Sequence, residues 1–511
     1  MAHLVQVLGN LIVEVPDDIN EIPFFETSLP RELAIKIFMH LDALDLCRCC
    51  QVSKAWKSLA EDELLWNQIC RHLDYEDSTA TVEKSRWKEI VREQVLKERQ
   101  LRQNWKMRHG EMSTLEYVTG GILCAANSWH HRLVAGYSNG HVRVWDDDDD
   151  CTFIPSNTAL AINELAECGT VSNIINRVCV NGHLAAASYS QGNVDIWMMN
   201  NGKTTPFSTL TLNKHIASLL CSKTDPLVVL HAGDTVWMYD LESSTSDNKF
   251  SEIPVGCDVF HLHIVPTKKH RSSRRMLAIG LYDQVRIHLI GEDPNNMSVV
   301  HNTISQKVTS LDCNSLQIAV GIHSDDGCMV KLYDLHKLKE AATLLGNTLP
   351  VSVINLVDSP QNSIVTGSCD GKIRIYDTRL SDPVITLQGH AGSLKCVQMD
   401  DWKVISGGNE GMVIVWDQRM ASKLWEQHNR HPVEYMAFKE HTMYTANIPV
   451  DKIPESDGFD SIYHRRYRGS LCCYDFSVDV VSHPDLPSNV LSNYDDPEGY
   501  NYNINLAVPY D

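Results

Sequence analysis

The sequence predicts a small all-α region, a helical linker and then an all-β propeller, with eight blades preferred and seven as the alternative. Two observations carry this prediction. Apolar residues recur at helical spacing over residues 24–73, and one five-residue element recurs eight times after Gly120. The chain has 511 residues, more than the roughly 100 to 200 of an average domain. One small unit and one large repeat unit account for this length.

The recurring element has the form apolar-x-apolar-aromatic-Asp. Its six complete copies are residues 142–146, 236–240, 330–334, 373–377, 413–417 and 471–475, and two copies without the Asp are 194–198 and 285–289. The aromatic position, filled by His288 in one copy, recurs every 40 to 58 residues. This spacing centres on the roughly 40 to 45 residues of one WD blade, and a β-sandwich would not require it.

Tight turns come before several copies, namely Asn139-Gly140, Asp370-Gly371 and Glu410-Gly411. These residue types tolerate the positive φ of a hairpin turn. Alternate apolar residues of each copy are expected to pack between neighbouring blades, with the aromatic ring closing the outer part of that interface. The copy that follows Gly389-His390 is the best of them, so Trp416 should be largely buried.

Short helices are predicted over residues 24–73. Thr27 or Ser28 can cap the first helix and Pro30 suits its first turn. Its apolar face carries Leu33, Ile37 and Leu41, which recur every four residues; Asp42 or Asp45 can start a second helix, and Ser53 a third that carries Trp56. Helices this short must pack on each other or on a partner.

The remaining boundaries place a leader at 1–23, a linker at 74–112 and the propeller with its C-terminal tail at 113–511. Residues 84–109 hold nine Lys/Arg against three Glu without Gly or Pro, and Gly110 then stops the helix. We interpret this charge as the solvated face of a stalk helix; a docking patch for an acidic partner is the alternative.

The net charge of -20 disfavours nucleic acid and anionic membranes as main partners. Residues 4–15 are apolar but too short to span a bilayer, and no basic segment precedes them, so a soluble intracellular protein is expected. Sixteen cysteines without regular spacing indicate reduced thiols and no zinc site. The aspartates at 146–150 are interpreted as a solvated loop. The sequence contains no GxSxG, GxxxxGK[ST] or HExxH motif, so we expect no enzyme active site, cofactor or metal.

A group of residues near the N-terminus resembles an F-box, the module that binds the Skp adaptor: Leu29, Pro30, Leu33, Ile37, Phe38, Leu41, Leu44, Val52, Ser53, Trp56, Leu65 and Trp66. From about residue 28 the chain is similar to the F-box/WD repeat-containing protein 8 family of animals. The segments 33–38 (LAIKIF), 50–66, 397–417 and 464–469 (HRRYRG) carry this resemblance. The chain differs from that family in its short leader.

The resemblance implies a non-catalytic substrate receptor of a cullin-type ubiquitin ligase. The F-box residues named above, apart from Ser53, would bind the Skp adaptor. The adaptor would bind cullin-7, or cullin-1, with its RING subunit, and the propeller would hold a protein substrate for ubiquitination and proteasomal degradation. A non-degradative interaction scaffold is the alternative. A cytoplasmic location is expected, with perinuclear or Golgi association and nuclear access left open.

The resemblance also implies a substrate-binding face. Lys395 is predicted at the start of a first strand, where similar propellers place basic residues at the channel mouth to hold phosphorylated or acidic segments. Arg177 is a weaker candidate at a similar position in an earlier blade. The basic loop at 268–275 (KKHRSSRR) is interpreted as an exposed insertion. Its alternatives are a nuclear-localisation signal, an anion-binding patch or a phosphorylation switch at Ser272 and Ser273.

Overall fold

The computed structural model describes residues 29–73, 87–115, 121–146, 151–153, 155, 174–199, 205–223, 225–241, 250–266, 275–291, 297–302, 306–325, 327–452 and 468–478. The predicted leader, Thr27, Ser28 and most of the basic loop and C-terminal tail lie outside these ranges. The chain divides into two compact units, Met1–Gln103 and Asn104–Asp511. This division falls inside the linker helix and not at its predicted end, residue 112.

Unit 1 is helical, as the spacing predicted. Its helices are α2 (Arg31–Phe38), α3 (Ala43–Cys49), α4 (Lys54–Ala60), α5 (Glu63–His72) and the greater part of α6 (Trp87–Met107). The carboxylate of Asp42 accepts the N–H of Asp45 at 2.7 Å, and the hydroxyl of Ser53 accepts the N–H of Trp56 at 3.1 Å. Both residues therefore cap the helices predicted for them. Pro30 is the N-cap of α2 and does not lie in its first turn.

The core of unit 1 is built from one face of each helix. Ala34, Ile35 and Phe38 of α2 pack with residues of α3, α4 and α5, and Val91 of α6 joins the same cluster. Lys88 of α6 pairs with Glu61 at 3.1 Å. The first turns of the linker helix therefore belong to this unit, while short helices such as α3 and α4 gain their stability from packing.

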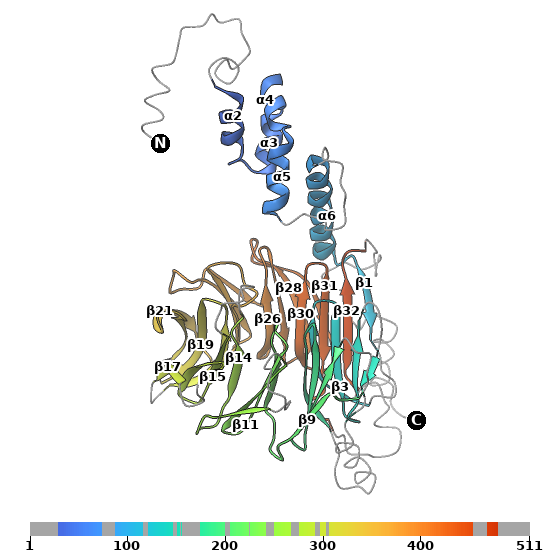
Figure 1. The fold of residues 1–511 in the computed structure, drawn as a ribbon, viewed down its shortest axis with the longest axis vertical. Helices are drawn as coiled ribbons and strands as arrows, with labels where there is room; N and C mark the ends of the chain where they lie inside the picture. The colour runs from blue at the N-terminus through green and yellow to red at the C-terminus, as the bar shows by residue number, and fades with distance from the viewer. Residues whose placement is uncertain are drawn as a thin grey trace, which may run out of the picture. The chain divides into compact units, whose positions relative to one another are not determined.

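Unit 2 is an eight-bladed propeller of eight four-stranded antiparallel sheets (Figure 1), which confirms the preferred blade count. We number the blades in chain order, each from its first strand outward. Blade 1 is β2 (Leu123–Trp129), β3 (Arg132–Tyr137), β4 (Val142–Trp145) and β5 (Cys151–Phe153); blade 2 is β6 (Ile175–Val180), β7 (Leu184–Tyr189), β8 (Asn193–Met198) and β9 (Ser208–Thr211). Blade 3 is β10 (Ser218–Cys221), β11 (Leu227–Ala232), β12 (Thr235–Asp240) and β13 (Ser251–Pro254); blade 4 is β14 (His261–Ile264), β15 (Met276–Gly280), β16 (Gln284–Leu289) and β17 (Met297–Asn302).

The remaining blades follow the same plan. Blade 5 is β18 (Lys307–Cys313), β19 (Gln317–Ser324), β20 (Gly327–Asp334) and β21 (Lys339–Asn347); blade 6 is β22 (Val351–Asn355), β23 (Ser363–Ser368), β24 (Lys372–Asp377) and β25 (Ile385–Gln388). Blade 7 is β26 (Leu394–Met399), β27 (Lys403–Gly408), β28 (Met412–Asp417) and β29 (Ser422–His428); blade 8 is β30 (Val433–Lys439), β31 (Thr442–Asn447), β32 (Ser470–Asp475) and β1 (Glu111–Thr114). First strands contact the first strands of neighbouring blades, so they line the centre of the ring.

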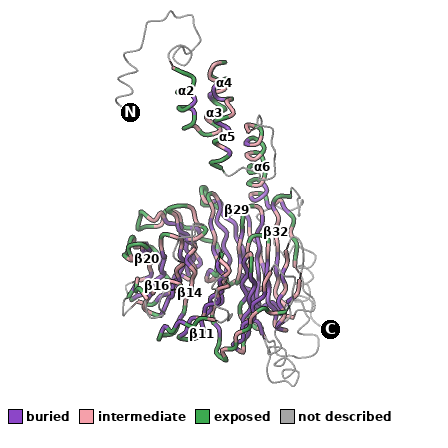
Figure 2. Tube along the Cα trace, in the orientation of Figure 1, coloured by how far each residue is buried: buried purple, intermediate pink, exposed green. Residues whose placement is uncertain are grey.

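The recurring element forms the third strand of every blade, from β4 to β32. Seven of its eight aromatic-position residues are buried, and Trp145 is half-buried. Trp416 is 4% exposed, as predicted. Figure 2 shows the buried residues running along the strands of the sheets. The turn glycines Gly140, Gly371 and Gly411 have φ of 83°, 74° and 87°, the conformation expected of these hairpins.

The ring is closed by the strand that precedes blade 1. β1 pairs antiparallel with β32, Met112 opposite Tyr474, and so completes blade 8 as its outermost strand. The propeller therefore begins at Glu111, two residues before the predicted boundary. Because one sheet contains strands from both ends of the propeller sequence, hydrogen bonds hold the ring closed.

The last turn of α6 belongs to unit 2 and is buried there. Trp105 is 1% exposed; its indole N–H donates to the carbonyl of Glu440 at 3.2 Å, and its carbonyl accepts the indole N–H of Trp425 at 2.7 Å. The side-chain amide of Asn104 donates to the carbonyl of Phe476 at 2.9 Å. The prediction of a solvated helix face thus holds for exposed cations such as Arg92. It does not hold for this last turn, where Asn104 and Trp105 are buried.

Candidate functional site

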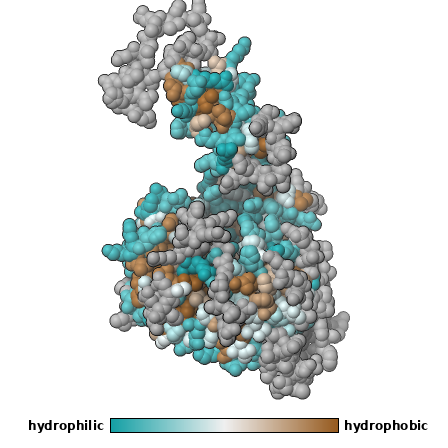
Figure 3. All heavy atoms as spheres, viewed as in Figure 1, coloured by the Kyte–Doolittle hydropathy of each residue, from teal (hydrophilic) through white to brown (hydrophobic). Residues whose placement is uncertain are grey.

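Unit 1 exposes apolar side chains on the outer face of α2. Leu33 is 46% exposed and Ile37 48% exposed, one helical turn apart on the same face. Pro30, Leu44 and Val52, also predicted to bind the adaptor, are exposed as well. Figure 3 shows apolar atoms on the visible surface of these helices. An exposed apolar group of this kind is typical of a protein-docking surface.

Three predicted contact residues lie instead in the core of unit 1. Phe38, Leu65 and Trp66 are buried, and the indole N–H of Trp66 donates to the carbonyl of Ala60 at 2.8 Å. These three side chains are covered by the unit itself and do not belong to its exposed face. They support the exposed face from beneath.

Half-buried residues lie between these two groups. Leu29, Leu41 and Trp56 pack against the core while keeping part of their surface accessible. Three exposed apolar residues of this region, Met39, Leu64 and Leu73, were not predicted. The signal for Leu64 was its position directly before Leu65, since adjacent helix residues point about 100° apart and cannot both face the core.

A second candidate surface lies at the end of the ring where the first strands begin, which we call the proximal end. Six of the eight first strands carry a β-bulge there, and the bulged residues are Cys124, Asn176, Thr309, Ser352, Lys395 and Glu434. A bulged residue is left out of strand pairing and its side chain is redirected. Lys395 therefore lies near the start of β26 as predicted. Its counterpart in blade 2 is Asn176, and Arg177 is the next residue along β6.

The two predicted cations differ in their surroundings. The ammonium of Lys395 pairs with the carboxylate of Glu434, its bulge counterpart in blade 8, at 3.0 Å. Arg177 is exposed, and its Nε donates to the carbonyl of Ala217 in blade 3 at 3.3 Å. Among the described residues its terminal guanidinium nitrogens have no partner. The terminal guanidinium nitrogens of Arg177 thus remain available to a ligand, whereas the charge of Lys395 is neutralised by Glu434.

Several polar side chains near the bulges join neighbouring blades. The amide of Asn176 donates to the carbonyl of Ile216 at 2.8 Å, and the hydroxyl of Ser352 donates to the carbonyl of Leu394 at 2.7 Å. These bonds run from one first strand to the next, so they fix the rim of the ring.

The opposite, distal end of the ring is bridged by its turns. The indole N–H of Trp129 in blade 1 donates to the carbonyl of Lys223 in blade 3 at 3.3 Å, and the ammonium of Lys223 pairs with Asp358 in blade 6 at 3.3 Å. These blades are not neighbours, so the contacts reach across the end of the ring. The proximal end is the better candidate for ligand approach.

The described residues contain no group of three or more His, Cys, Asp or Glu placed to hold a metal ion. Burial raises the pKa of the Cys124 and Cys396 thiols to about 12, so both are protonated and weakly nucleophilic at neutral pH. In the same part of the chain, no helix is long and apolar enough to cross a membrane.

Comparison with known proteins agrees with this architecture. A family model described as F-box-like matches residues 27–72, and one described as WD domain, G-beta repeat matches residues 112–146, 338–377 and 381–417. The F-box/WD repeat-containing protein 8 of Mus musculus is 35% identical over 97% of this chain and 82% of its own length. The chain belongs to the F-box/WD repeat-containing protein 8 family. The Homo sapiens member is also 35% identical, over 99% of this chain and 83% of its own length.

More distant matches cover one unit each. A protein of Talaromyces stipitatus named as a probable E3 ubiquitin ligase complex SCF subunit is 50% identical over 46 residues, 9% of this chain and 7% of its own length. The solved Dos1 propeller covers 73% of this chain and 96% of its own with a TM-score of 0.52 at 13% identity, and Saccharomyces cerevisiae Sqt1 covers 69% and 96% with 0.51 at 12%. At such identities these two structures support the propeller fold alone.

Proposed function

We propose that this protein is the substrate-recognition subunit of an SCF-like cullin-RING E3 ubiquitin ligase. The observation that carries the proposal is the set of exposed apolar side chains of the F-box, on a chain whose second unit is a propeller. Leu33 and Ile37 share one face of α2, and Leu44 and Val52 of the same unit are exposed as well. A relative in Talaromyces stipitatus is named as a subunit of such a complex, which supports the same function here.

The two units would have different roles in this complex. The F-box binds the Skp adaptor, and the adaptor binds cullin-7 with its RING subunit, cullin-1 being the alternative. The propeller binds a protein substrate through its proximal end, with Arg177 and Lys395 as candidate contacts. The receptor supplies no reacting group and acts by holding substrate lysines near the ubiquitin thioester, which raises their effective concentration. The substrate is then degraded by the proteasome, and the complex works in the cytoplasm.

The adaptor contact can be tested on the exposed face alone. The double variant Leu33→Glu, Ile37→Glu places two charges on the proposed interface and leaves the core of unit 1 unchanged. We expect it to lose at least about tenfold of the co-purifying Skp adaptor, because charged side chains would be buried without partners. Leu96→Glu is the matched control, since Leu96 is an exposed leucine on α6.

Quantifying cullin-7 and cullin-1 in the same purification identifies the cullin. Substrates that accumulate when the double variant replaces the natural protein would distinguish a degradative receptor from a scaffold. Normal adaptor recovery by the double variant would refute the assignment.

A further inference from the structure

We propose that blade 4 carries an aromatic docking site at the proximal end of the ring, and that its ligand is a peptide segment with one large apolar side chain next to a single acidic group. The proposal rests on the proposed function, in that the segment would belong to a protein substrate. It adds a named site and a chemical class of ligand, and it does not use the predicted contacts Lys395 and Arg177.

Two neighbouring aromatic side chains form the site. Phe260 is 52% exposed and Tyr282 56% exposed, with ring centroids 6.1 Å apart and ring planes at 61°. The N–H of Phe260 donates to the carbonyl of Gly280 at 2.9 Å, and the carbonyl of Tyr282 accepts the N–H of Val308 at 2.8 Å. Hydrogen bonds between strands therefore hold the backbone at both residues, while both rings face solvent. Binding a ligand would thus cost little backbone conformational entropy.

Such a pair is well suited to protein recognition. Aromatic residues dominate the energetics of protein interfaces because they bury a large apolar area with few rotatable bonds. Phe260 directly precedes β14, and Tyr282 lies in the turn between β15 and β16, so both are at the proximal end. The turns at the distal end are joined across the ring by the Lys223–Asp358 pair. A ligand that approaches the proximal end therefore meets these rings.

A cation next to the rings defines the charge of the ligand. Lys307 is the exposed first residue of β18, and its ammonium lies 5.5 Å from the ring centroid of Tyr282. Among the described residues no carboxylate pairs with Lys307. An acidic group of the ligand could thus bind this ammonium while an apolar side chain covers the rings.

The acidic group should be single. Asp258 is exposed two residues before Phe260, and the half-buried Asp283 directly follows Tyr282. These carboxylates would repel a run of acidic residues laid across the same loops. The site therefore favours an apolar side chain with one acidic neighbour over a polyacidic segment.

The test begins with a library of random dodecapeptides displayed on phage and selected on the purified full chain. We expect enrichment of peptides with Trp, Phe, Leu or Met beside one Asp or Glu. The best peptide is then labelled, and its affinity is measured by fluorescence polarisation. Versions with phosphoserine in place of the acidic residue show whether the acid is a phosphate or a carboxylate; tighter binding of one identifies that source.

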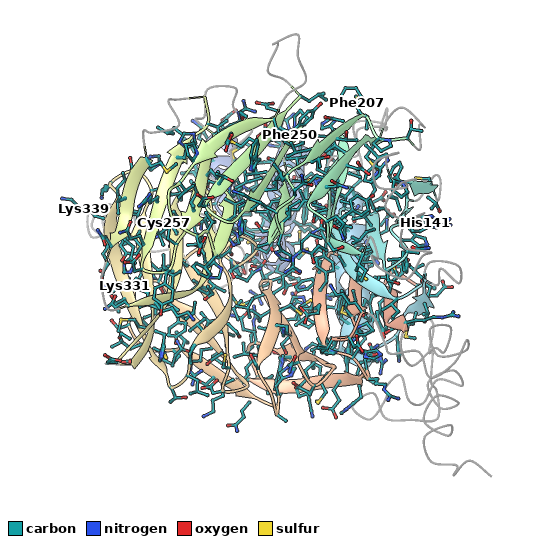
Figure 4. The ribbon with its side chains drawn as sticks, turned by 90° about the horizontal axis from the view of Figure 1, so that it is seen from below. His141, Phe207, Phe250, Cys257, Lys331 and Lys339 are labelled. Carbon is teal, nitrogen blue, oxygen red and sulfur yellow. The ribbon has the colours of Figure 1, made fainter. Side chains whose placement is uncertain are left out.

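Two variants and two matched controls locate the site. The double variant Phe260→Ala, Tyr282→Ala and the single variant Lys307→Glu should each weaken peptide binding at least about tenfold, the size of a hot-spot loss. Phe207→Ala and Lys339→Glu should leave it unchanged. Both control residues adjoin outermost strands, β9 and β21, and Figure 4 shows them at the circumference of the propeller. Equal melting temperatures would show that all four variants are folded.

The proposal is overturned if no peptide is enriched, if the enriched peptides are basic, or if the blade 4 variants bind like the controls. Adaptor co-purification is measured on the unsubstituted chain. Absence of adaptor binding by that chain, together with peptide binding that the blade 4 variants weaken, would contradict the ligase assignment and leave the docking site standing.

Discussion

At the scale of single residues, the neighbouring side chains decide whether a charged residue is free to bind a ligand. Its position along the strand matters less. Lys395 and Glu434 occupy equivalent bulges of adjacent blades and neutralise each other at 3.0 Å. Arg177 lies one residue beyond the equivalent bulge, and only its Nε donates a hydrogen bond to the neighbouring blade. A partly exposed ion pair is weak, about 0 to 1 kcal/mol, so Lys395 can be released from it.

The first prediction compares these cations. Arg177→Glu should reduce recovery of ubiquitin-linked substrates more than Lys395→Glu does, at equal adaptor binding. The charge of Lys395 is already neutralised by Glu434, whereas among the described residues the terminal guanidinium nitrogens of Arg177 have no partner. Glu434→Gln should increase the contribution of Lys395 by freeing its ammonium. A larger loss for Lys395→Glu, or no loss for either variant, would contradict the assignment of Arg177 to the substrate face.

The second prediction concerns the buried polar chain of blade 7. The indole N–H of Trp416 donates to the hydroxyl of Ser406 at 3.0 Å, and that hydroxyl contacts Nε2 of His390 at 2.7 Å. Trp416→Ala would leave a cavity and remove one of the hydrogen bonds of the Ser406 hydroxyl, and should cost about 3 to 5 kcal/mol of unfolding free energy. Denaturant unfolding measures this change, with Phe207→Ala as the control on an exposed ring. An unchanged midpoint would be inconsistent with the burial of Trp416.

At the scale of elements, the last turn of α6 acts as part of the propeller. The rings of Trp105 and Phe476 stack with centroids 3.8 Å apart, and the ammonium of Lys403 lies 4.4 Å from the Trp105 ring. Lys106 pairs with Asp417 at 3.2 Å. This turn therefore contacts strands of blade 7 and of blade 8, the sheet that closes the ring.

The third prediction follows from this packing. Trp105→Ala should lower the free energy of unfolding of unit 2 by about 3 to 5 kcal/mol, although Trp105 lies in a helix and outside every blade. Leu96→Ala on the exposed face of the same helix should change it by less than about 0.5 kcal/mol. Thermal melting of both variants gives the comparison. Equal melting temperatures would show that the helix end is not part of the folded propeller.

At the scale of the whole molecule, eight sheets share one ring, and buried or half-buried titratable groups connect its stability to pH. Burial lowers the pKa of His231, His261 and His263 to about 4, from an ordinary value of 6.5. Burial also raises the pKa of Asp312 to about 6, which acts in the opposite direction. The carboxylate of Asp312 faces His263 at 3.7 Å and accepts the N–H of Leu356 at 2.6 Å.

The fourth prediction is a loss of stability in mild acid. The three histidines are neutral in the folded state but take up protons near pH 6.5 when unfolded. Their contribution is therefore complete above pH 6.5 and is lost as the pH falls towards about 4. Protonation of Asp312 in the folded state restores part of this stability below about pH 6. The net effect is still a loss, because three histidines contribute to the decrease and one aspartate opposes it.

Urea unfolding at several pH values measures this dependence. His231→Leu should flatten it, whereas His336→Leu, on an exposed turn, should not. A stability that is constant from pH 7.5 to 5, or that rises over this range, would contradict the prediction.

The sequence by itself determined the features that depend on neighbours along the chain. The recurring element predicted eight blades because strand alternation and turn chemistry are local, and the caps Asp42 and Ser53 were predicted because a cap bonds only two or three residues ahead. It also identified the apolar residues of the F-box.

Only the tertiary structure decided which of those apolar residues face outward. Leu33 and Phe38 are both apolar residues of α2. Packing against α3 to α5 buries Phe38, whereas Leu33 stays exposed. The structure likewise paired Lys395 with Glu434, which are 39 positions apart in the sequence. It also showed that Asn176, and not Arg177, is the blade 2 counterpart of Lys395, and it brought Phe260 beside Tyr282. The physical reason is common to all four: side-chain exposure and pairing depend on contacts between separate strands and helices, and spacing along one segment does not contain them.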